Sequence, residues 1–147
     1  MIKLAVFGDP IGHSLSPVIH TEFAEQAGLV IDYTRIQASA REFAEHFSRF
    51  VSEGGVGANI TLPLKELALE LADQLTPIAT QAGAVNTLVK NNGSWLGTNT
   101  DGMGLVSDIE QHNINLQGTQ ILLLGAGGAA RGVVPALLSA KVASIHV

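Results

Sequence analysis

The side chains able to do chemistry in this sequence gather in four short segments, each placed where a strand is expected to give way to a helix. They supply hydroxyls near a helix start, amide groups, a lysine and an aspartate: Ser14, Ser16, Asn59, Thr61, Lys65, Asn86 and Asp101. In an open α/β sheet such junctions lie along one edge, where ligands bind. Hydroxyls and free N–H groups at a helix start suit a carboxylate or a phosphate. The segments therefore predict one small-molecule site with an anion-binding end.

Each segment also has a structural interpretation, and at this point both stay open. Ser16 precedes Pro17 and is well placed to cap a helix that starts there, and Asp101 is well placed to cap the next one. Asn86 can simply close a backbone hydrogen bond. Lys65 falls in the first turn of an expected helix, where it opposes the helix dipole, so helix stability does not explain its position. It is either solvated or held near a cleft, where its surroundings can tune it for proton transfer.

A glycine-rich turn near the C-terminus predicts a nucleotide site. The aliphatic run Ile121–Leu124 is followed by Gly125–Ala130 and then by an apolar helical stretch. Strand, glycine turn and helix in this order are typical of a dinucleotide-binding fold, whose pyrophosphate lies on the helix N-terminus. Arg131 faces either phosphate or solvent. The chain stops at Val147, one strand further on, so we expect a complete first domain joined to the opening of a second.

The remaining pattern alternates strands with helices, which predicts an α/β fold with a mostly parallel open sheet and helices on both faces, followed by the first β-α-β unit of a Rossmann-like domain. Phe43, Phe47 and Phe50 are spaced as the core-facing stripe of a helix. Asn91-Asn92-Gly93 predicts a hairpin turn. We expect strands over residues 4–7, 31–36, 57–61, 84–89, 95–96 and 121–124. Helices are expected over 17–27, 41–52, 64–75 and 101–112, with a short one after Pro77. The first carries Ile19, Phe23 and Ala27 on one face, and the helix over 64–75 has an apolar stripe of Leu64, Leu67, Leu71 and Leu75.

Composition narrows the function classes. Charged residues make up 14% of the 147 residues, against roughly 25% in typical soluble domains. We therefore expect apolar surface that faces another domain or subunit. The net charge of −5 without a basic run argues against nucleic acid as a partner. No apolar run approaches the roughly 18 residues of a membrane span, and no leader precedes the first strand, so we expect a cytoplasmic protein. The five histidines lack metal-binding spacing, and the serines lack a nucleophile elbow, so neither a metal site nor Ser-His-Asp hydrolysis is expected.

Five motifs in one order resemble the shikimate dehydrogenase family. They are GDPIGHSLSP at 8–17, GANITLPLK at 57–65, GAVNT at 83–87, GTNTDG at 97–102 and GAGGAAR at 125–131. The resemblance covers every residue of the chain but only about the first half of a family member. It implies a shikimate-binding catalytic domain over residues 1–100, a linking helix and loop over 101–118, and the start of an NADP-binding Rossmann domain over 119–147.

The resemblance also implies an activity: reversible, NADP-dependent reduction of 3-dehydroshikimate to shikimate, in the biosynthesis of chorismate and aromatic amino acids. Lys65 and Asp101 resemble the catalytic pair. The implied substrate-binding residues are Ser14 and Ser16 for the carboxylate and Asn59, Thr61 and Asn86 for hydroxyls. The implied cofactor-binding residues are Gly125, Ala126, Gly127, Gly128, Ala129 and Arg131. Two alternatives remain: a quinate/shikimate dehydrogenase that uses NAD, and a non-catalytic module that binds such an acid.

Further expectations concern the half of the family pattern that is absent. The segment that selects NADP over NAD would begin just after Val147, and later helices would complete the substrate pocket. We therefore expect this chain alone to bind shikimate weakly and to have little activity. Because two strands and one helix cannot cover their own apolar faces, we expect residues 119–147 to form a homodimer contact or to be poorly ordered. The central prediction is that Lys65 and Asp101 meet in one crevice.

Overall fold

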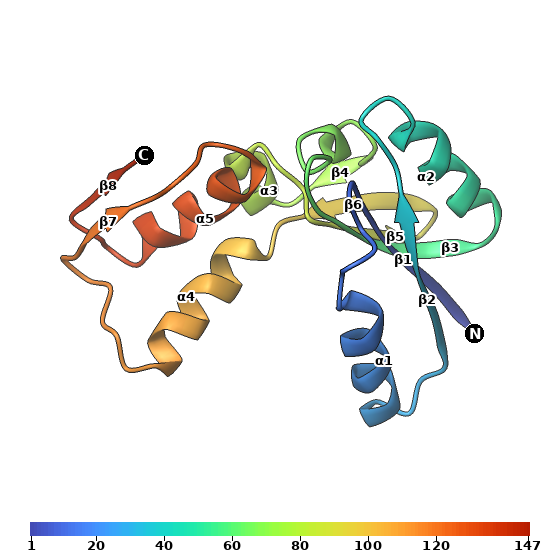
Figure 1. Cartoon of the computed structure of the whole chain (residues 1–147), viewed down its shortest axis with the longest axis horizontal. Coiled ribbons are helices and arrows are strands. Elements are labelled where there is room, and N and C mark those ends of the chain that lie inside the picture. Colours follow the sequence, from blue (N-terminus) through green and yellow to red (C-terminus); the bar gives the residue numbers. More distant parts are fainter.

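The computed structural model describes all 147 residues and contains two sheets joined through helices (Figure 1). The elements, in chain order, are β1 (Ile2–Gly8), α1 (Ser16–Gln26), β2 (Ile31–Gln37), α2 (Phe43–Ser52), β3 (Gly55–Ile60), the 3-10 turn η1 (Leu67–Leu69), β4 (Gln74–Leu75), α3 (Pro77–Ala82), β5 (Thr87–Asn91), β6 (Ser94–Thr98), α4 (Asp101–Gln111), β7 (Gln120–Leu122), α5 (Gly128–Ser139) and β8 (Ser144–His146). Every helix falls short of the length and apolarity that crossing a bilayer requires.

The larger sheet has six strands in the order β2-β1-β3-β5-β6-β4. β1 pairs in parallel with β2 and β3, and β4 pairs in parallel with β6, whereas β5 is antiparallel to both of its neighbours. Five strands therefore point one way and β5 alone runs against them, which confirms the mostly parallel sheet. The reversal is local, because Asn92 and Gly93 both have positive φ and close the predicted hairpin between β5 and β6.

The core lies between the sheet and α2. Residues alternate between the two faces along β1, and Phe7 points to the α2 face. Its ring lies 5.6 Å from that of Phe43 and 5.7 Å from that of Phe50. Phe47 in turn packs edge-on against Trp95 of β6, with ring centroids 4.9 Å apart. The predicted phenylalanine stripe is confirmed, and α1 lies on the opposite side of the sheet (Figure 1).

The helix predicted over residues 64–75 is wrong. Only the 3-10 turn Leu67–Leu69 forms there, and Leu75 belongs to β4. Asp73 explains the difference, because its N–H donates to the Trp95 carbonyl at 2.8 Å and its carboxylate accepts the Trp95 N–H at 2.6 Å. These bonds dock the segment on β6 as an edge strand, so a tertiary contact overrides the helical spacing of the leucines.

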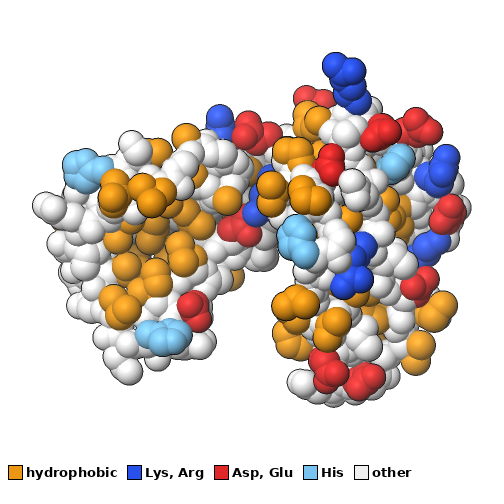
Figure 2. All heavy atoms as spheres, in the orientation of Figure 1, with side chains coloured by type: hydrophobic (Ala, Val, Ile, Leu, Met, Phe, Trp, Pro, Cys, Tyr) orange, Lys and Arg blue, Asp and Glu red, His pale blue; other side chains and the backbone are white.

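The face of α1 that carries Ile19, Phe23 and Ala27 points to solvent. Ile19 is 45% exposed and Phe23 is 60% exposed, and Ala27 is exposed as well. The helix instead turns His20 and Ala24 to the sheet, since the His20 ring stacks on Tyr33 of β2 at 4.5 Å. Apolar side chains are consequently open to solvent along α1, and Figure 2 shows others on the C-terminal unit.

The C-terminal unit consists of the parallel pair β7 and β8 with α5 between them in the chain. Its helix packs closely on α4, because a Cβ at Gly102 would lie 2.7 Å from the Gly132 carbonyl oxygen and 2.7 Å from the Ala136 Cβ. The predicted order of strand, glycine turn and helix is present, since β7 leads through residues 123–127 into α5. Leu122 and Leu124 remain exposed beside it.

The contrast between buried and exposed phenylalanines leads to a prediction about stability. Phe43 is 2% exposed, so Phe43→Ala should cost about 3–5 kcal/mol of unfolding free energy or leave the chain unfolded. The exposed Phe23 provides the matched control, and Phe23→Ala should change stability by about 0.5 kcal/mol or less. Urea unfolding followed by circular dichroism measures both. Equal losses in the two variants would contradict the assignment of the core.

Candidate active site

The seven side chains singled out from the sequence line one cleft of about 290 Å³ at the edge of the larger sheet. They are Ser14, Ser16, Asn59, Thr61, Lys65, Asn86 and Asp101. The cleft lies where β1, β3 and β6 end and where the antiparallel β5 begins, which is the shared edge that the sequence predicts. Pro10, His13 and His20 also line the cleft.

Lys65 and Asp101 form an ion pair within this cleft. The Lys65 Nζ lies 2.7 Å from the Asp101 Oδ2, and the two side chains are only 14% and 21% exposed. Residues 36 positions apart in the chain therefore meet, which confirms the central spatial prediction. An ammonium and a carboxylate held together and mostly away from water can position a proton for transfer.

Asp101 does not cap α4, so that interpretation is wrong. Its own N–H donates to the Oδ1 of Asn99 at 3.0 Å, and the carboxylate is left free to accept from Lys65. Asn99 is 2% exposed and donates from Nδ2 to the Ala84 carbonyl at 3.0 Å. Sequence reasoning missed this anchoring role of Asn99, although its position two residues before Asp101 is where such a turn residue is expected.

Asn86 holds the other oxygen of the carboxylate. Its Nδ2 donates to the Asp101 Oδ1 at 2.9 Å and to the Thr100 Oγ1 at 2.8 Å. Its Oδ1 accepts from the Thr87 hydroxyl at 2.8 Å and from the Thr100 N–H at 3.1 Å. Asn86 therefore does more than close one backbone hydrogen bond, since it joins β5 to the first turn of α4.

Asn59 lies across the cleft and is held by two residues that sequence reasoning missed. The Tyr33 hydroxyl donates to its Oδ1 at 2.6 Å, and its Nδ2 donates to the Thr87 Oγ1 at 3.2 Å. Thr87 follows Asn86, and the two polar residues interrupt the otherwise apolar run of the strand expected over 84–89, so a signal for Thr87 was present. Tyr33 gave no such signal, because aromatic residues are common in strands, where they usually pack against neighbouring side chains.

The two serines lie at the start of α1, but Ser16 does not cap the helix as the capping interpretation expected. Ser14, not Ser16, accepts the backbone N–H of Ser16 at 3.2 Å, and the two hydroxyls are 3.1 Å apart. The Ser14 carbonyl accepts two bonds from the Arg35 guanidinium, at 2.9 and 2.7 Å. Arg35 thus ties this loop to β2 and keeps both hydroxyls at the cleft.

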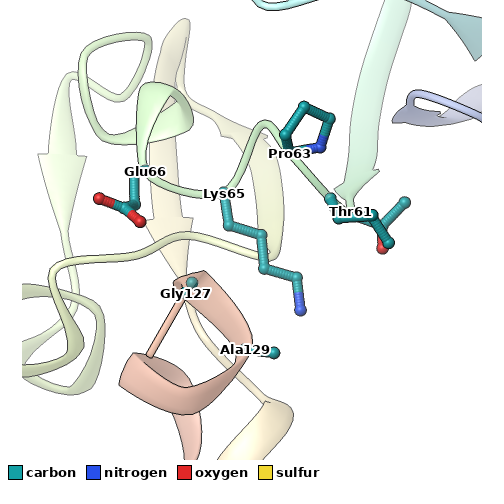
Figure 3. A pocket seen from close by; sticks show the side chains of 8 residues that line it. Thr61, Pro63, Lys65, Glu66, Gly127 and Ala129 are labelled. Carbon is teal, nitrogen blue, oxygen red and sulfur yellow. The ribbon is translucent and has the colours of Figure 1, made fainter. Parts of the chain in front are cut away.

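The glycine turn lies beside Lys65 and forms a second hollow of about 310 Å³. One wall comes from the turn after β3, including Thr61, Lys65 and Glu66, and the other from Gly127, Gly128 and Ala129. Figure 3 shows Lys65 extending between Thr61 and the first turn of α5, while Glu66 points away. The approach is close, since a Cβ at Gly128 would lie 3.1 Å from the Lys65 Cβ.

This hollow fits a pyrophosphate by its donor groups. α5 begins at Gly128 without a side-chain cap, so its first N–H groups are available to an anion. Gly125 has φ +113, a conformation that favours glycine, and the space next to Gly125 and Gly127 is open. Arg131 instead lies 3.5 Å from Glu66. Ala126 lines a separate hollow with Ala130, Arg131 and Val147.

Comparison with known proteins identifies the family. Residues 6–88, more than half of the chain, match the family described as the shikimate dehydrogenase substrate binding domain. The chain belongs to this family. Lys65 lies within the matched region, and Asp101 follows it in the chain.

Relatives and solved structures agree with this assignment. A shikimate dehydrogenase (NADP(+)) of Xanthomonas euvesicatoria pv. vesicatoria is 57% identical over 99% of this chain and 52% of its own length. The one of Xylella fastidiosa strain Temecula1 is 54% identical over the same shares. The structure of shikimate 5-dehydrogenase from Thermus thermophilus in complex with shikimate matches with a TM-score of 0.90 and 36% identity, covering 99% of this chain and 56% of that one. The chain thus spans about half the length of the curated relatives it matches.

Tyr33 generates a prediction about pH. Burial raises the pKa of its hydroxyl to about 12, and the Ser16 hydroxyl opposes part of that rise. The neutral phenol is favoured in the folded chain, so its contribution to stability is complete below about pH 10 and is lost as pH rises towards 12. Tyr33 is the single tyrosine, so phenolate absorbance reports it alone. A midpoint near pH 10 in the native chain, as in the urea-unfolded control, would contradict this environment.

Proposed function

We propose that these 147 residues are the substrate-binding half of an NADP-dependent shikimate dehydrogenase, which reversibly reduces 3-dehydroshikimate to shikimate. The observation that carries the proposal is the Lys65–Asp101 pair, held at 2.7 Å in a cleft that opens beside a glycine turn. The relatives' names support it, as does the shikimate complex of the Thermus thermophilus structure.

The cleft offers matching groups for a polyhydroxylated acid. Ser14 and Ser16 would bind its carboxylate through two hydroxyls at a helix start. Asn59 and Thr61 would bind ring hydroxyls from the β3 side. Asn86 would bind another through the N–H that now points to the Thr100 hydroxyl. One anion site and several fixed donors and acceptors are what such a molecule requires.

Lys65 and Asp101 would carry the proton chemistry. Bound NADPH supplies the hydride for the carbonyl carbon of 3-dehydroshikimate. Lys65 would donate a proton to the oxygen of that carbonyl as negative charge develops there, and it would recover the proton from the shikimate hydroxyl in the reverse direction. Asp101 would keep the ammonium in place and accept a bond from a neighbouring ring hydroxyl.

The glycine turn would hold the cofactor pyrophosphate through Gly125, Ala126, Gly127, Gly128 and Ala129. Arg131, held beside Glu66, would lie at the edge of that site. We assign residues 1–100 to the substrate domain, 101–118 to the link and 119–147 to the start of the nucleotide domain. The reaction draws on a charged, diffusible cofactor that is kept inside cells, so we place the enzyme in the cytoplasm, in chorismate biosynthesis.

An assay of the intact protein that carries this sequence tests the function. Shikimate and NADP should give NADPH absorbance, and Lys65→Ala should lower kcat by about 10²–10⁴-fold while changing KM little. Lys90→Ala, on the exposed hairpin strand β5, is the matched control and should keep full turnover.

The same assay separates the alternatives. Faster turnover with quinate or NAD would favour the quinate/shikimate relative, and absence of any turnover would leave an acid-binding module. Undiminished kcat in Lys65→Ala would remove Lys65 from the mechanism. The 147 residues by themselves should show little turnover and at most weak binding of shikimate by calorimetry, because the rest of the nucleotide domain is needed to position the nicotinamide.

We further propose that the 147-residue chain pairs with a second copy through its C-terminal unit. Leu122, Leu124 and Val147 are exposed there, with Leu124 at 88%. Sedimentation should show self-association, and Leu124→Asp should weaken it. Val18→Asp on the exposed face of α1 is the control and should leave it unchanged. A wild-type monomer at all accessible concentrations would contradict the proposal.

A further inference from the structure

Tyr33 and Thr87 complete a continuous series of hydrogen bonds that leads to the Lys65–Asp101 pair. Tyr33 donates to the Asn59 Oδ1 at 2.6 Å, and the Asn59 Nδ2 donates to the Thr87 Oγ1 at 3.2 Å. Thr87 donates to the Asn86 Oδ1 at 2.8 Å, and the Asn86 Nδ2 donates to the Asp101 Oδ1 at 2.9 Å. The Lys65 ammonium then closes the series on the other carboxylate oxygen. We call these six residues the polar series.

The series follows the register of the sheet. Thr87 is the cross-strand partner of Asn59 in the antiparallel pair of β3 and β5. Tyr33 lies on the same sheet face, two strands away, and is in register with Leu4, whose other partner is Gly57. Gly57 has no side chain, and a Cβ there would lie 2.9 Å from Leu4. The Tyr33 hydroxyl can therefore reach across β1 to Asn59, and strand pairing holds both ends in place.

The order of donors matters because each asparagine carboxamide has two orientations related by a half-turn. Thr87 has one proton, which it gives to Asn86, so it can only accept from Asn59. Tyr33 donates to the oxygen of Asn59, because a phenol is protonated at neutral pH. The Asn86 carboxamide is set in one orientation by the Thr87 hydroxyl and the Thr100 N–H, which both donate to its Oδ1, and its amide group faces Asp101. If Asn86 turned over, its oxygen would face a carboxylate, and the two would repel.

We propose that Tyr33 and Thr87 are positioning residues that, together with the Thr100 N–H, fix the orientation of the Asn59 and Asn86 carboxamides. Through Asn86, Thr87 holds the Asp101 carboxylate in place for Lys65. Through Asn59, Tyr33 makes the cleft present an N–H donor, and not an acceptor, to a substrate hydroxyl. The inference rests on the proposed function for its effect on turnover, but the orientation of the carboxamides can be measured without it.

The test compares Thr87→Val, Thr87→Ser and Tyr33→Phe in the intact protein. Thr87→Val keeps the side-chain shape and removes the hydroxyl, so kcat should fall roughly 5- to 30-fold, as expected when a partly buried polar group loses its partner. Thr87→Ser should restore most of it. Tyr33→Phe should raise KM for shikimate by a similar factor with a smaller effect on kcat. Thr80→Val is the control, because Thr80 is exposed on α3 and its hydroxyl bonds only to the Thr76 carbonyl.

A second readout does not depend on activity. NMR hydrogen exchange of the side-chain amide protons should be faster for Asn86 in Thr87→Val than in the wild type, and the Thr87→Ser rate should return towards it. Equal rates in Thr87→Val and wild type would overturn the inference, and so would a Thr87→Ser variant as impaired as Thr87→Val. If the wild type fails to oxidise shikimate while the exchange rates respond as expected, the proposed function fails and the positioning role stands.

Discussion

The ion pair between Lys65 and Asp101 constrains the rest of the cleft, because a charge at so sheltered a position is costly unless it is paired and fully hydrogen-bonded. Three consecutive residues help to hold the pair in place. The Ala84 carbonyl accepts from Asn99, which anchors the start of α4, and the Val85 N–H donates to the Lys65 carbonyl at 2.8 Å. Asn86 then bonds the carboxylate itself. The segment just before β5 therefore holds three parts of the site together: the backbone at Lys65, the start of α4 and the Asp101 carboxylate.

Glycines in α4 and α5 let the helix that follows the glycine turn pack closely against this pair. A Cβ at Gly132 would lie 3.0 Å from the Asp101 Oδ2 and 2.9 Å from the Asn99 Oδ1, and Gly102 has no room for one either. Glycine in a helix interior lowers helix stability by roughly 0.5–1 kcal/mol relative to alanine. Here it allows α5 to lie directly against the aspartate. The helix that would hold a phosphate and the residue that would hold the proton donor thus share one packed contact.

Local patterns predicted much of this fold, and tertiary contacts account for what they missed. Asn92-Gly93 fixes a hairpin by its own conformation, and the phenylalanine stripe of α2 faces the core wherever the sheet lies. The leucine spacing over residues 64–75 failed because Asp73 pairs with the backbone of Trp95, which is distant in sequence. The seven cleft residues were found because their types are unusual at strand ends. Tyr33 was missed because its role depends on Asn59, a partner 26 residues away.

The single antiparallel strand explains why the asparagines can cooperate. A parallel strand delivers the residues that follow it to the active edge, whereas β5 runs the other way and delivers those that precede and begin it, Asn86 and Thr87. Thr87 then lies directly opposite Asn59 at that edge. The next strand, β6, returns in the common direction and ends just before Asn99 and Asp101. A tight hairpin therefore brings polar residues from both of its ends into one hydrogen-bonded group with Lys65. In a wholly parallel sheet, a crossover connection would have to replace the hairpin.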